Sequence, residues 1–109
     1  MKLIRTLFLL FFLSLNVVVV FAQKEDAIKY FNSGLKKLNQ DRDTVGALAD
    51  FSKSLTLDST NRNAIFNRGL IYICQKRYNE ALLDFDNAIK LYPRYPELYG
   101  NRGNLKLIL

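Results

Sequence analysis

The chain has 109 residues, with 16 Lys and Arg against 10 Asp and Glu, one Cys and no His. This length allows a single domain. The absence of histidine excludes imidazole bases, His-containing triads and His-ligated metal sites, and a single cysteine excludes an internal disulfide and a thiolate zinc site. We therefore expect no metal, no cofactor and no catalytic residues.

The N-terminus has the features of a secretory signal peptide. Lys2 and Arg5 form a short basic start, residues 7–21 form an apolar run, and a small-x-small pattern ends at Ala22. The apolar run is shorter than the roughly 20 residues that a membrane-spanning helix usually needs. We therefore expect residues 1–22 to be a cleaved signal peptide, with an uncleaved membrane anchor as the alternative. The mature chain is then exported to the periplasm or the extracellular space.

After this segment the sequence repeats itself. Small, aromatic and glycine positions coincide at a shift of 34 residues, pairing Ala47 with Ala81, Phe51 with Phe85, and Gly69 with Gly103. Residues 31–34 match residues 66–69 at a shift of 35, so one extra residue falls in the polar loop between these stretches. Periods of about 20–50 residues indicate a solenoid built from repeats.

Within each period the apolar residues recur at steps of three and four, which is the spacing of an amphipathic helix. No segment alternates with a period of two, so we predict an all-α chain. Pro93 stops one helix, and Pro96 suits the first turn of the next. Five helices are expected, at about 24–39, 44–57, 62–75, 78–91 and 96–108.

This pattern resembles the tetratricopeptide-repeat (TPR) family, in which small, aromatic and proline residues stand at fixed positions. The residues that fill those positions in the second unit are Ile65, Gly69, Tyr72, Ala81, Phe85, Ala88 and Pro93. The resemblance implies a TPR-like α-solenoid of helix-turn-helix repeats, about two and a half repeats long. Its expected boundaries are a signal peptide at 1–22 and a TPR domain at 23–109, with repeat 1 at about 27–60, repeat 2 at about 62–95 and the first helix of repeat 3 at about 96–109.

Glycine recurs at one position in the first helix of each repeat. A glycine inside a helix costs about 1 kcal/mol relative to alanine, so its repetition requires a packing reason. We predict that Gly34 and Gly69 allow the second helix of each hairpin to approach closely through Ala47 and Ala81.

The TPR resemblance also implies that the first helices of successive repeats line a concave groove. The residues expected to face this groove are Phe31, Asn32, Leu35, Phe66, Asn67, Leu70, Gly100, Asn101 and Asn104. Asn32, Asn67 and Asn101 form a ladder of amides, which can donate to and accept from the backbone of an extended peptide. The same amides can instead bond neighbouring helices and hold the stack together. Both interpretations remain open at this point.

Some TPR proteins hold the acidic C-terminus of heat-shock chaperones with Lys, Asn, Asn, Lys and Arg on successive first helices. The corresponding positions in this chain hold Phe31, Leu35, Asn67, Glu97 and Asn101. Only the asparagine at 67 agrees, and Glu97 has the wrong sign for gripping a carboxylate. We therefore expect the groove to bind a neutral or apolar extended segment of a protein or peptide partner.

The charged residues predict neither nucleic-acid binding nor catalysis. Basic residues are scattered, whereas nucleic-acid binding usually needs a concentrated stripe, and Arg68 and Arg102 are expected on a solvated outer side. Asp84 and Asp86 are expected to be exposed on different sides of one helix, which gives no paired-carboxylate site. Cys74 is expected to be an inert thiol. We predict a non-enzymatic binding module.

A structural role is the alternative. No second helix follows the final helix in the sequence. The final helix ends with the apolar residues Leu105, Leu107, Ile108 and Leu109. Each apolar side chain left in water forgoes roughly 1.5–3 kcal/mol of burial. In this alternative the chain is a fragment or subunit that self-associates through its uncapped C-terminal helix.

Overall fold

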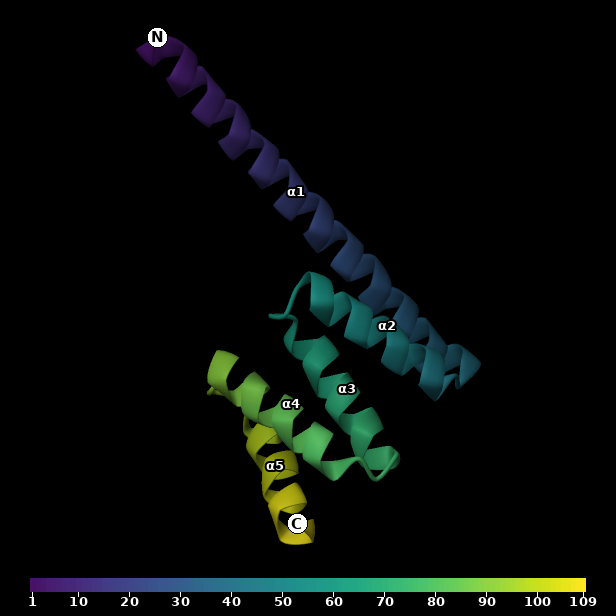
Figure 1. Cartoon of the computed structure of the whole chain (residues 1–109). Coiled ribbons are helices and arrows are strands. Elements are labelled where there is room, and N and C mark those ends of the chain that lie inside the picture. The colour runs from purple at the N-terminus through teal and green to yellow at the C-terminus, as the bar shows by residue number, and fades with distance from the viewer.

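The computed structural model describes residues 1–109, and helices account for nearly all of them (Figure 1). The helices are α1 (Lys2–Lys36), α2 (Thr44–Leu57), α3 (Arg62–Cys74), α4 (Tyr78–Leu91) and α5 (Pro96–Ile108), and α1 continues into a π-helical turn, η1 (Lys37–Asp41). The predicted all-α fold is confirmed. The last four helices begin and end within one residue of the predicted positions.

The first helix is longer than predicted, because α1 begins at Lys2 instead of near residue 24. The first 33 residues contain no Gly and no Pro, so nothing interrupts the helix between the apolar segment and the first repeat. Residues 2–22 are exposed throughout and project away from the other helices (Figure 1). This helix is long and apolar enough to cross a membrane, a property that signal sequences share. Residues 2–22 therefore contribute nothing to the core.

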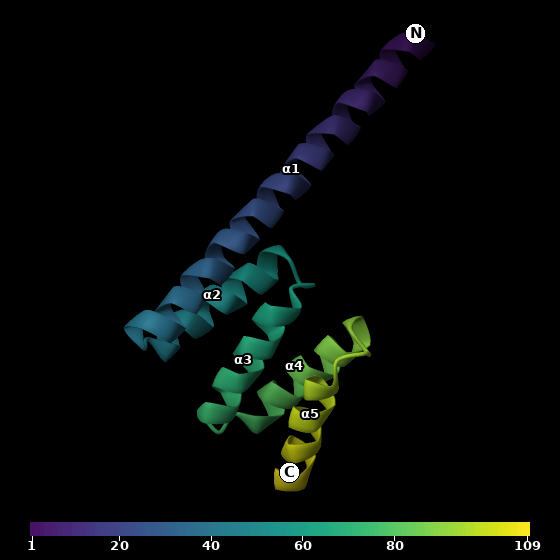
Figure 2. The ribbon, with the colours of Figure 1, turned by 180° about the vertical axis from the view of Figure 1, so that it is seen from behind.

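The remaining helices stack in chain order. α1 packs against α2, α2 against α3, α3 against α4, and α4 against α5. Figures 1 and 2 show the same zigzag from both sides, with the two termini at opposite ends of an elongated molecule. Because each helix contacts mainly its neighbours in the sequence, the architecture is that of a solenoid.

Aromatic side chains of the second helices form the centre of each hairpin. Phe51 on α2 and Phe85 on α4 are completely buried. The ring of Phe51 lies 5.8 Å from that of Phe31, and the ring of Phe85 lies 5.9 Å from that of Phe66. Such aromatic pairs contribute about 0.5–1.5 kcal/mol beyond the area they bury. In both repeats a pair of aromatic rings therefore forms part of the contact between the first and the second helix.

The repeated glycines make room for these rings. A Cβ on Gly34 would lie 2.8 Å from the ring of Phe51, and a Cβ on Gly69 would lie 3.0 Å from the ring of Phe85. The predicted close approach is therefore present, but it involves the phenylalanines and not the alanines that lie one turn earlier. Gly103 differs, since a Cβ there would meet nothing within 4 Å.

The C-terminal helix is partly buried, which corrects one prediction. Leu105 was expected to be exposed with the other apolar residues of this helix, but it is only 1% exposed and belongs to the core. It lies two helical turns after Leu98, which is equally buried, and both contact the rest of the core. Leu107, Ile108 and Leu109 are exposed as predicted.

Glycine-to-alanine substitutions at two positions distinguish the packing role of a glycine from its poor helix propensity. Gly103→Ala should stabilise the chain by about 0.5–1 kcal/mol, because alanine is the better helix former and no atom lies nearby. Gly34→Ala should destabilise it by about 1–3 kcal/mol, because the new Cβ overlaps the buried ring of Phe51. Urea unfolding followed by circular dichroism measures both free energies. Equal effects at the two positions would contradict the packing role of Gly34.

Candidate functional site

A shallow pocket of about 140 Å³ lies between α3 and α5, the first helices of the second and third repeats. Its lining residues are Arg62, Asn63, Phe66, Glu97 and Leu98. Of the predicted groove residues, Phe66 lines this pocket. The pocket offers the half-buried ring of Phe66 as apolar surface, with a cation and a carboxylate nearby, which is the mixture that anchors a side chain and fixes its orientation.

The predicted apolar groove residues also support the core. Phe31, Leu35, Phe66 and Leu70 are half-buried and pack against the buried cluster. One side of each residue therefore stabilises the fold, and the remaining side is available to a ligand. Because the core holds these side chains in place, a groove built on them is rigid.

The amides of the groove bond to their own helices. The Nδ2 atoms of Asn67 and Asn101 each donate, at 2.8 Å, to the backbone carbonyl four residues earlier. These hydrogen bonds do not join neighbouring helices, so they do not hold the stack together. An amide that donates one hydrogen retains a second donor and an acceptor oxygen. Asn32 and Asn104 are exposed to solvent.

Arg62 is a pocket residue that the sequence analysis missed. Its guanidinium stacks on the ring of Tyr95, with Cζ 3.5 Å from the ring centroid, and its Nη1 is buried without a hydrogen-bond partner. The aromatic ring fixes the cation beside the pocket. The equivalent residues in the other repeats are Ala27 and Pro96, so the repeat gave no signal for this position.

Arg68 lies inside the hairpin and not on the solvated side where it was predicted. Its Nε and Nη2 donate to the two carboxylate oxygens of Asp84 at 2.8 and 2.6 Å. Asp84 is buried, which also corrects its predicted exposure. The Nη1 atom reaches the hydroxyl of Ser52 on α2 at 3.5 Å. The bidentate ion pair with Asp84 links α3 to α4, and the contact with Ser52 links α3 to the preceding hairpin.

The first repeat holds an aspartate in the same way. The Ser33 hydroxyl donates to Asp50 at 2.6 Å, and the Nζ of Lys37 lies 2.9 Å from the same carboxylate. Burial acts to raise the pKa of Asp50, but the hydrogen bonds from Ser33 and Lys37 outweigh it and lower the pKa below its usual value. In both repeats, therefore, the residue before the glycine binds the aspartate before the buried phenylalanine.

A larger hollow of about 340 Å³ lies among α2, α3 and α4. Arg68 and Asp84 line it, together with Leu55, Ile65 and other residues of these helices. The two charged groups already satisfy each other, so they leave no free charge for a ligand. Of the two hollows, the α3–α5 pocket is the stronger candidate for a binding site.

Comparison with known proteins identifies the repeat. Residues 63–95 match the family model described as tetratricopeptide repeat. The chain is similar to the second TPR of Spaghetti (RPAP3) bound to HSP90 peptide SRMEEVD, with a TM-score of 0.71 and 25% identity over 80% of this chain and 82% of that one. It is also similar to the first TPR of Spaghetti (RPAP3) bound to the same peptide, with a TM-score of 0.67 and 24% identity over 77% of this chain and 68% of that one. No curated protein matches the chain in sequence.

Acidification should weaken the first repeat. Because the folded-state pKa of Asp50 is lowered, its contacts stabilise the fold above the unfolded pKa of about 3.9, and this contribution is lost as the pH falls through the folded pKa. Thermal melts from neutral pH to about pH 3 should therefore show a falling Tm. The fall should be smaller in Asp50→Asn and unchanged in the control Asp86→Asn, whose side chain is half-exposed. A fall of full size in Asp50→Asn would contradict the assignment.

Proposed function

We propose that this chain, a member of the tetratricopeptide-repeat family, binds a peptide or protein partner in the groove formed by α1, α3 and α5. The proposal rests on the pocket between α3 and α5, where the half-buried ring of Phe66 offers apolar surface beside Arg62 and Glu97. The two similar TPR structures both hold a peptide, which supports this use of the fold. The proposed function is binding, which requires no catalytic residue.

The groove chemistry favours a neutral, partly apolar segment. The HSP90 peptide held by the similar structures is SRMEEVD, whose glutamates and aspartate are acidic. In this chain Phe31 and Leu35 replace two of the polar groups expected of a chaperone-binding groove, and Glu97 lines the pocket. A carboxylate on the ligand would be repelled by Glu97 and attracted by Arg62, so the two charges of the pocket together give an acidic ligand no net advantage. An apolar side chain resting on Phe66 meets no such penalty.

The amide ladder is proposed to hold the ligand backbone. An extended peptide presents an N–H donor or a carbonyl acceptor at each residue. The amides of Asn32, Asn67, Asn101 and Asn104 come from all three first helices, so together they can follow such a backbone across the groove. Contacts to the backbone give affinity without selecting a particular side chain.

We further propose that the domain acts outside the cytosol after export directed by residues 1–22. The exposed apolar helix and its basic start support this proposal. If the segment is retained instead, it anchors the domain at a membrane surface, because α1 runs without a break from the apolar segment into the first repeat.

Self-association through the C-terminal helix is the second candidate function. Leu107 is 87% exposed, and Ile108 and Leu109 are also exposed, which favours this candidate. Leu105 takes no part because it is buried. Replacing Leu107 and Leu109 by Lys would abolish such association and leave the α3–α5 pocket intact.

Peptide selection tests the groove proposal directly. A phage-displayed peptide library, selected on the full chain in lipid nanodiscs, should yield neutral segments with an apolar anchor. The triple variant Asn32→Ala, Asn67→Ala, Asn101→Ala should bind the selected peptide about tenfold more weakly or worse, because each amide loses its backbone contacts. Calorimetric titration measures the affinities.

Asn79→Ala is the matched control for that experiment. Asn79 is exposed near the start of α4, outside the groove, so its substitution should leave the affinity unchanged. Enrichment of acidic peptides, or equal affinity for the triple variant and the wild type, would refute the groove chemistry.

Export is tested by the mass of the protein isolated from its native cells. Cleavage after Ala22 should give a chain that begins at Gln23, which intact-mass spectrometry detects directly. An intact chain beginning at Met1 in the membrane fraction would instead establish the anchored form.

A further inference from the structure

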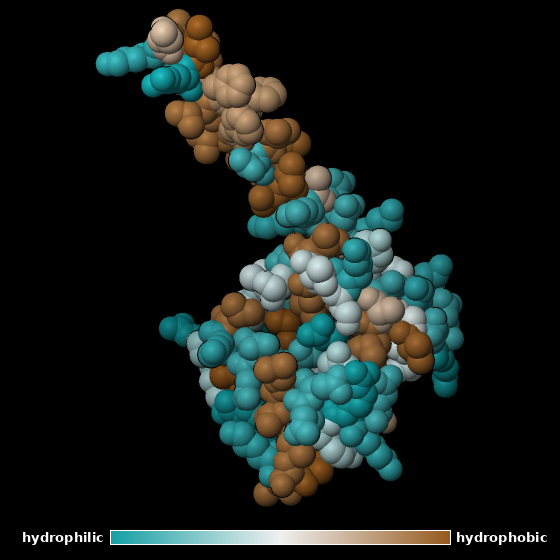
Figure 3. Space-filling view, viewed as in Figure 1, coloured by the Kyte–Doolittle hydropathy of each residue, from teal (hydrophilic) through white to brown (hydrophobic).

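The exposed apolar segment of α1, residues 2–22, runs without a break into the first repeat. Figure 3 shows that its apolar surface gives way to hydrophilic surface where α1 reaches the domain. The first charged residues after the segment are Lys24, Glu25 and Asp26. Charged side chains are costly in the hydrocarbon core of a bilayer, so they lie among the headgroups. In the anchored form these three residues therefore mark the level of the lipid headgroups.

The turn between α2 and α3 lies beside this level of α1. α2 returns along α1, and Ser54 near its end donates to the backbone carbonyl of Ala27 at 2.7 Å. The α2–α3 turn follows directly. The pKa of its Asp58 is lowered by hydrogen bonds from Thr60 and also by the charge of Lys24. The α2–α3 turn is therefore close to the point where α1 leaves the apolar segment.

The turn between α4 and α5 is attached to the same edge of the domain. The hydroxyl of Tyr92 donates to the backbone carbonyl of Thr60 in the α2–α3 turn. The ring of Tyr95 lies under the guanidinium of Arg62 at the start of α3, with Cζ 3.5 Å from the ring centroid. These two contacts hold the α4–α5 turn beside the α2–α3 turn.

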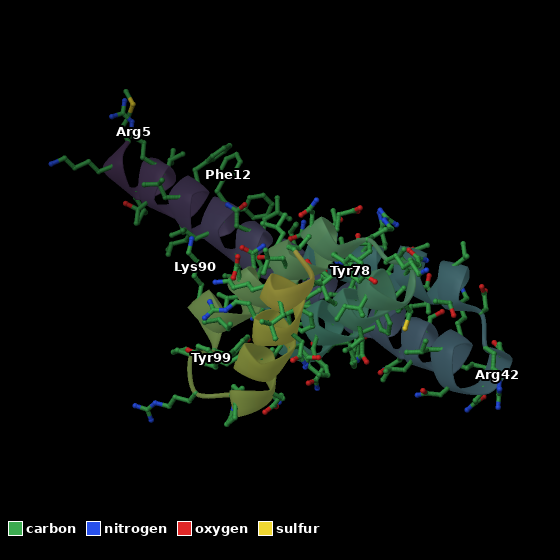
Figure 4. All side chains as sticks on the ribbon, turned by 90° about the horizontal axis from the view of Figure 1, so that it is seen from below. Arg5, Phe12, Arg42, Tyr78, Lys90 and Tyr99 are labelled. Atoms are coloured by element: carbon green, nitrogen blue, oxygen red, sulfur yellow. The ribbon has the colours of Figure 1, made fainter.

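The figures show which edge of the domain this is. In Figure 1 both turns between repeats lie at the edge nearest the apolar segment, and the turns within repeats lie at the opposite edge. In Figure 4 Lys90, near the end of α4, lies on the side of Phe12 in the apolar segment, and Arg42 lies at the far end. The edge that carries the α4–α5 turn therefore faces the bilayer when the segment is inserted.

Residues 90–95, at the α4–α5 turn, have the composition of a segment that contacts lipid headgroups. Lys90 and Arg94 are exposed, and neither takes part in an ion pair. Leu91 is 46% exposed, Tyr95 is 37% exposed, and the segment contains no Asp or Glu. Lys and Arg are attracted to anionic lipids, and Tyr is enriched at the membrane interface because its ring is apolar and its hydroxyl is polar. This turn therefore suits an anionic lipid surface.

We propose that the α4–α5 turn rests on the anionic headgroups of the bilayer that holds the apolar segment. Lys90 and Arg94 bind lipid phosphates, and Leu91 and Tyr95 lie at the boundary between headgroups and acyl chains. This inference rests on the anchored form of the chain proposed above. A domain attached only through α1 can tilt on the membrane, and a second contact removes that freedom. The turn thus holds the groove of α1, α3 and α5 in one orientation close to the membrane.

Tryptophan fluorescence tests this contact, because the chain contains no Trp. The Tyr95→Trp variant carries a single fluorophore in the turn and keeps an aromatic ring under Arg62. The Tyr78→Trp variant, at the other end of α4, is the matched control. The full chain is reconstituted into phosphatidylcholine–phosphatidylglycerol vesicles whose acyl chains are brominated near the headgroup. The fluorescence of Tyr95→Trp should be quenched, and that of Tyr78→Trp should not.

Reversal of the two charges tests the role of the anionic lipid. Lys90→Glu with Arg94→Glu, made in the Tyr95→Trp chain, should abolish the quenching, and high salt should weaken it, because both reduce the attraction to anionic headgroups. Lys36→Glu with Lys76→Glu makes the same change of charge at exposed positions on the opposite edge. That control should leave the quenching unchanged.

Flotation of the vesicles distinguishes failure of the anchor from failure of the turn contact. A chain that does not float with the vesicles would refute the anchored form, and this inference with it. A chain that floats while Tyr95→Trp stays unquenched would overturn the contact of the turn alone. Quenching that survives the charge reversal at Lys90 and Arg94 would overturn the assignment of anionic lipid as the binding partner.

Discussion

Two phenylalanine rings lie directly against glycine backbone, and the rest of the structure depends on this contact. Phe51 covers Gly34, and Phe85 covers Gly69, at distances that leave no room for a side chain on the glycine. Glycine is costly in a helix, and the burial of a whole aromatic ring offsets that cost. The contact sets how closely the two helices of each hairpin approach. It also brings the aspartate before each phenylalanine to the polar residues of the first helix.

The proposed binding surface is a consequence of the same packing. Phe31 and Phe66 hold the buried rings on one side and leave the other side half-exposed on the first helices. Stacking of the hairpins then places α3 beside α5, where the pocket forms. A ligand in this groove contacts side chains that the core has already fixed, so little conformational entropy is lost on binding.

The repeat predicted most of this architecture, because recurring residues report contacts that recur between neighbouring helices. The helix boundaries after residue 43 and the importance of the glycines were evident from sequence. Arg68 and Asp84 were misjudged, since a charged residue in an isolated helix is normally solvated, and only its position beside Gly69 indicates the buried side. Leu105 was misjudged in the same way. Arg62 could not be predicted, because its role depends on the ring of Tyr95 from a later loop.

Proton NMR tests the central contact most directly. The Hα protons of Gly34 and Gly69 lie against aromatic rings and should show ring-current shifts and nuclear Overhauser contacts to Phe51 and Phe85, respectively. Gly103, which has no ring beside it, should show the chemical shift of an ordinary helical glycine. Similar shifts for all three glycines, without Overhauser contacts to the rings, would contradict the account.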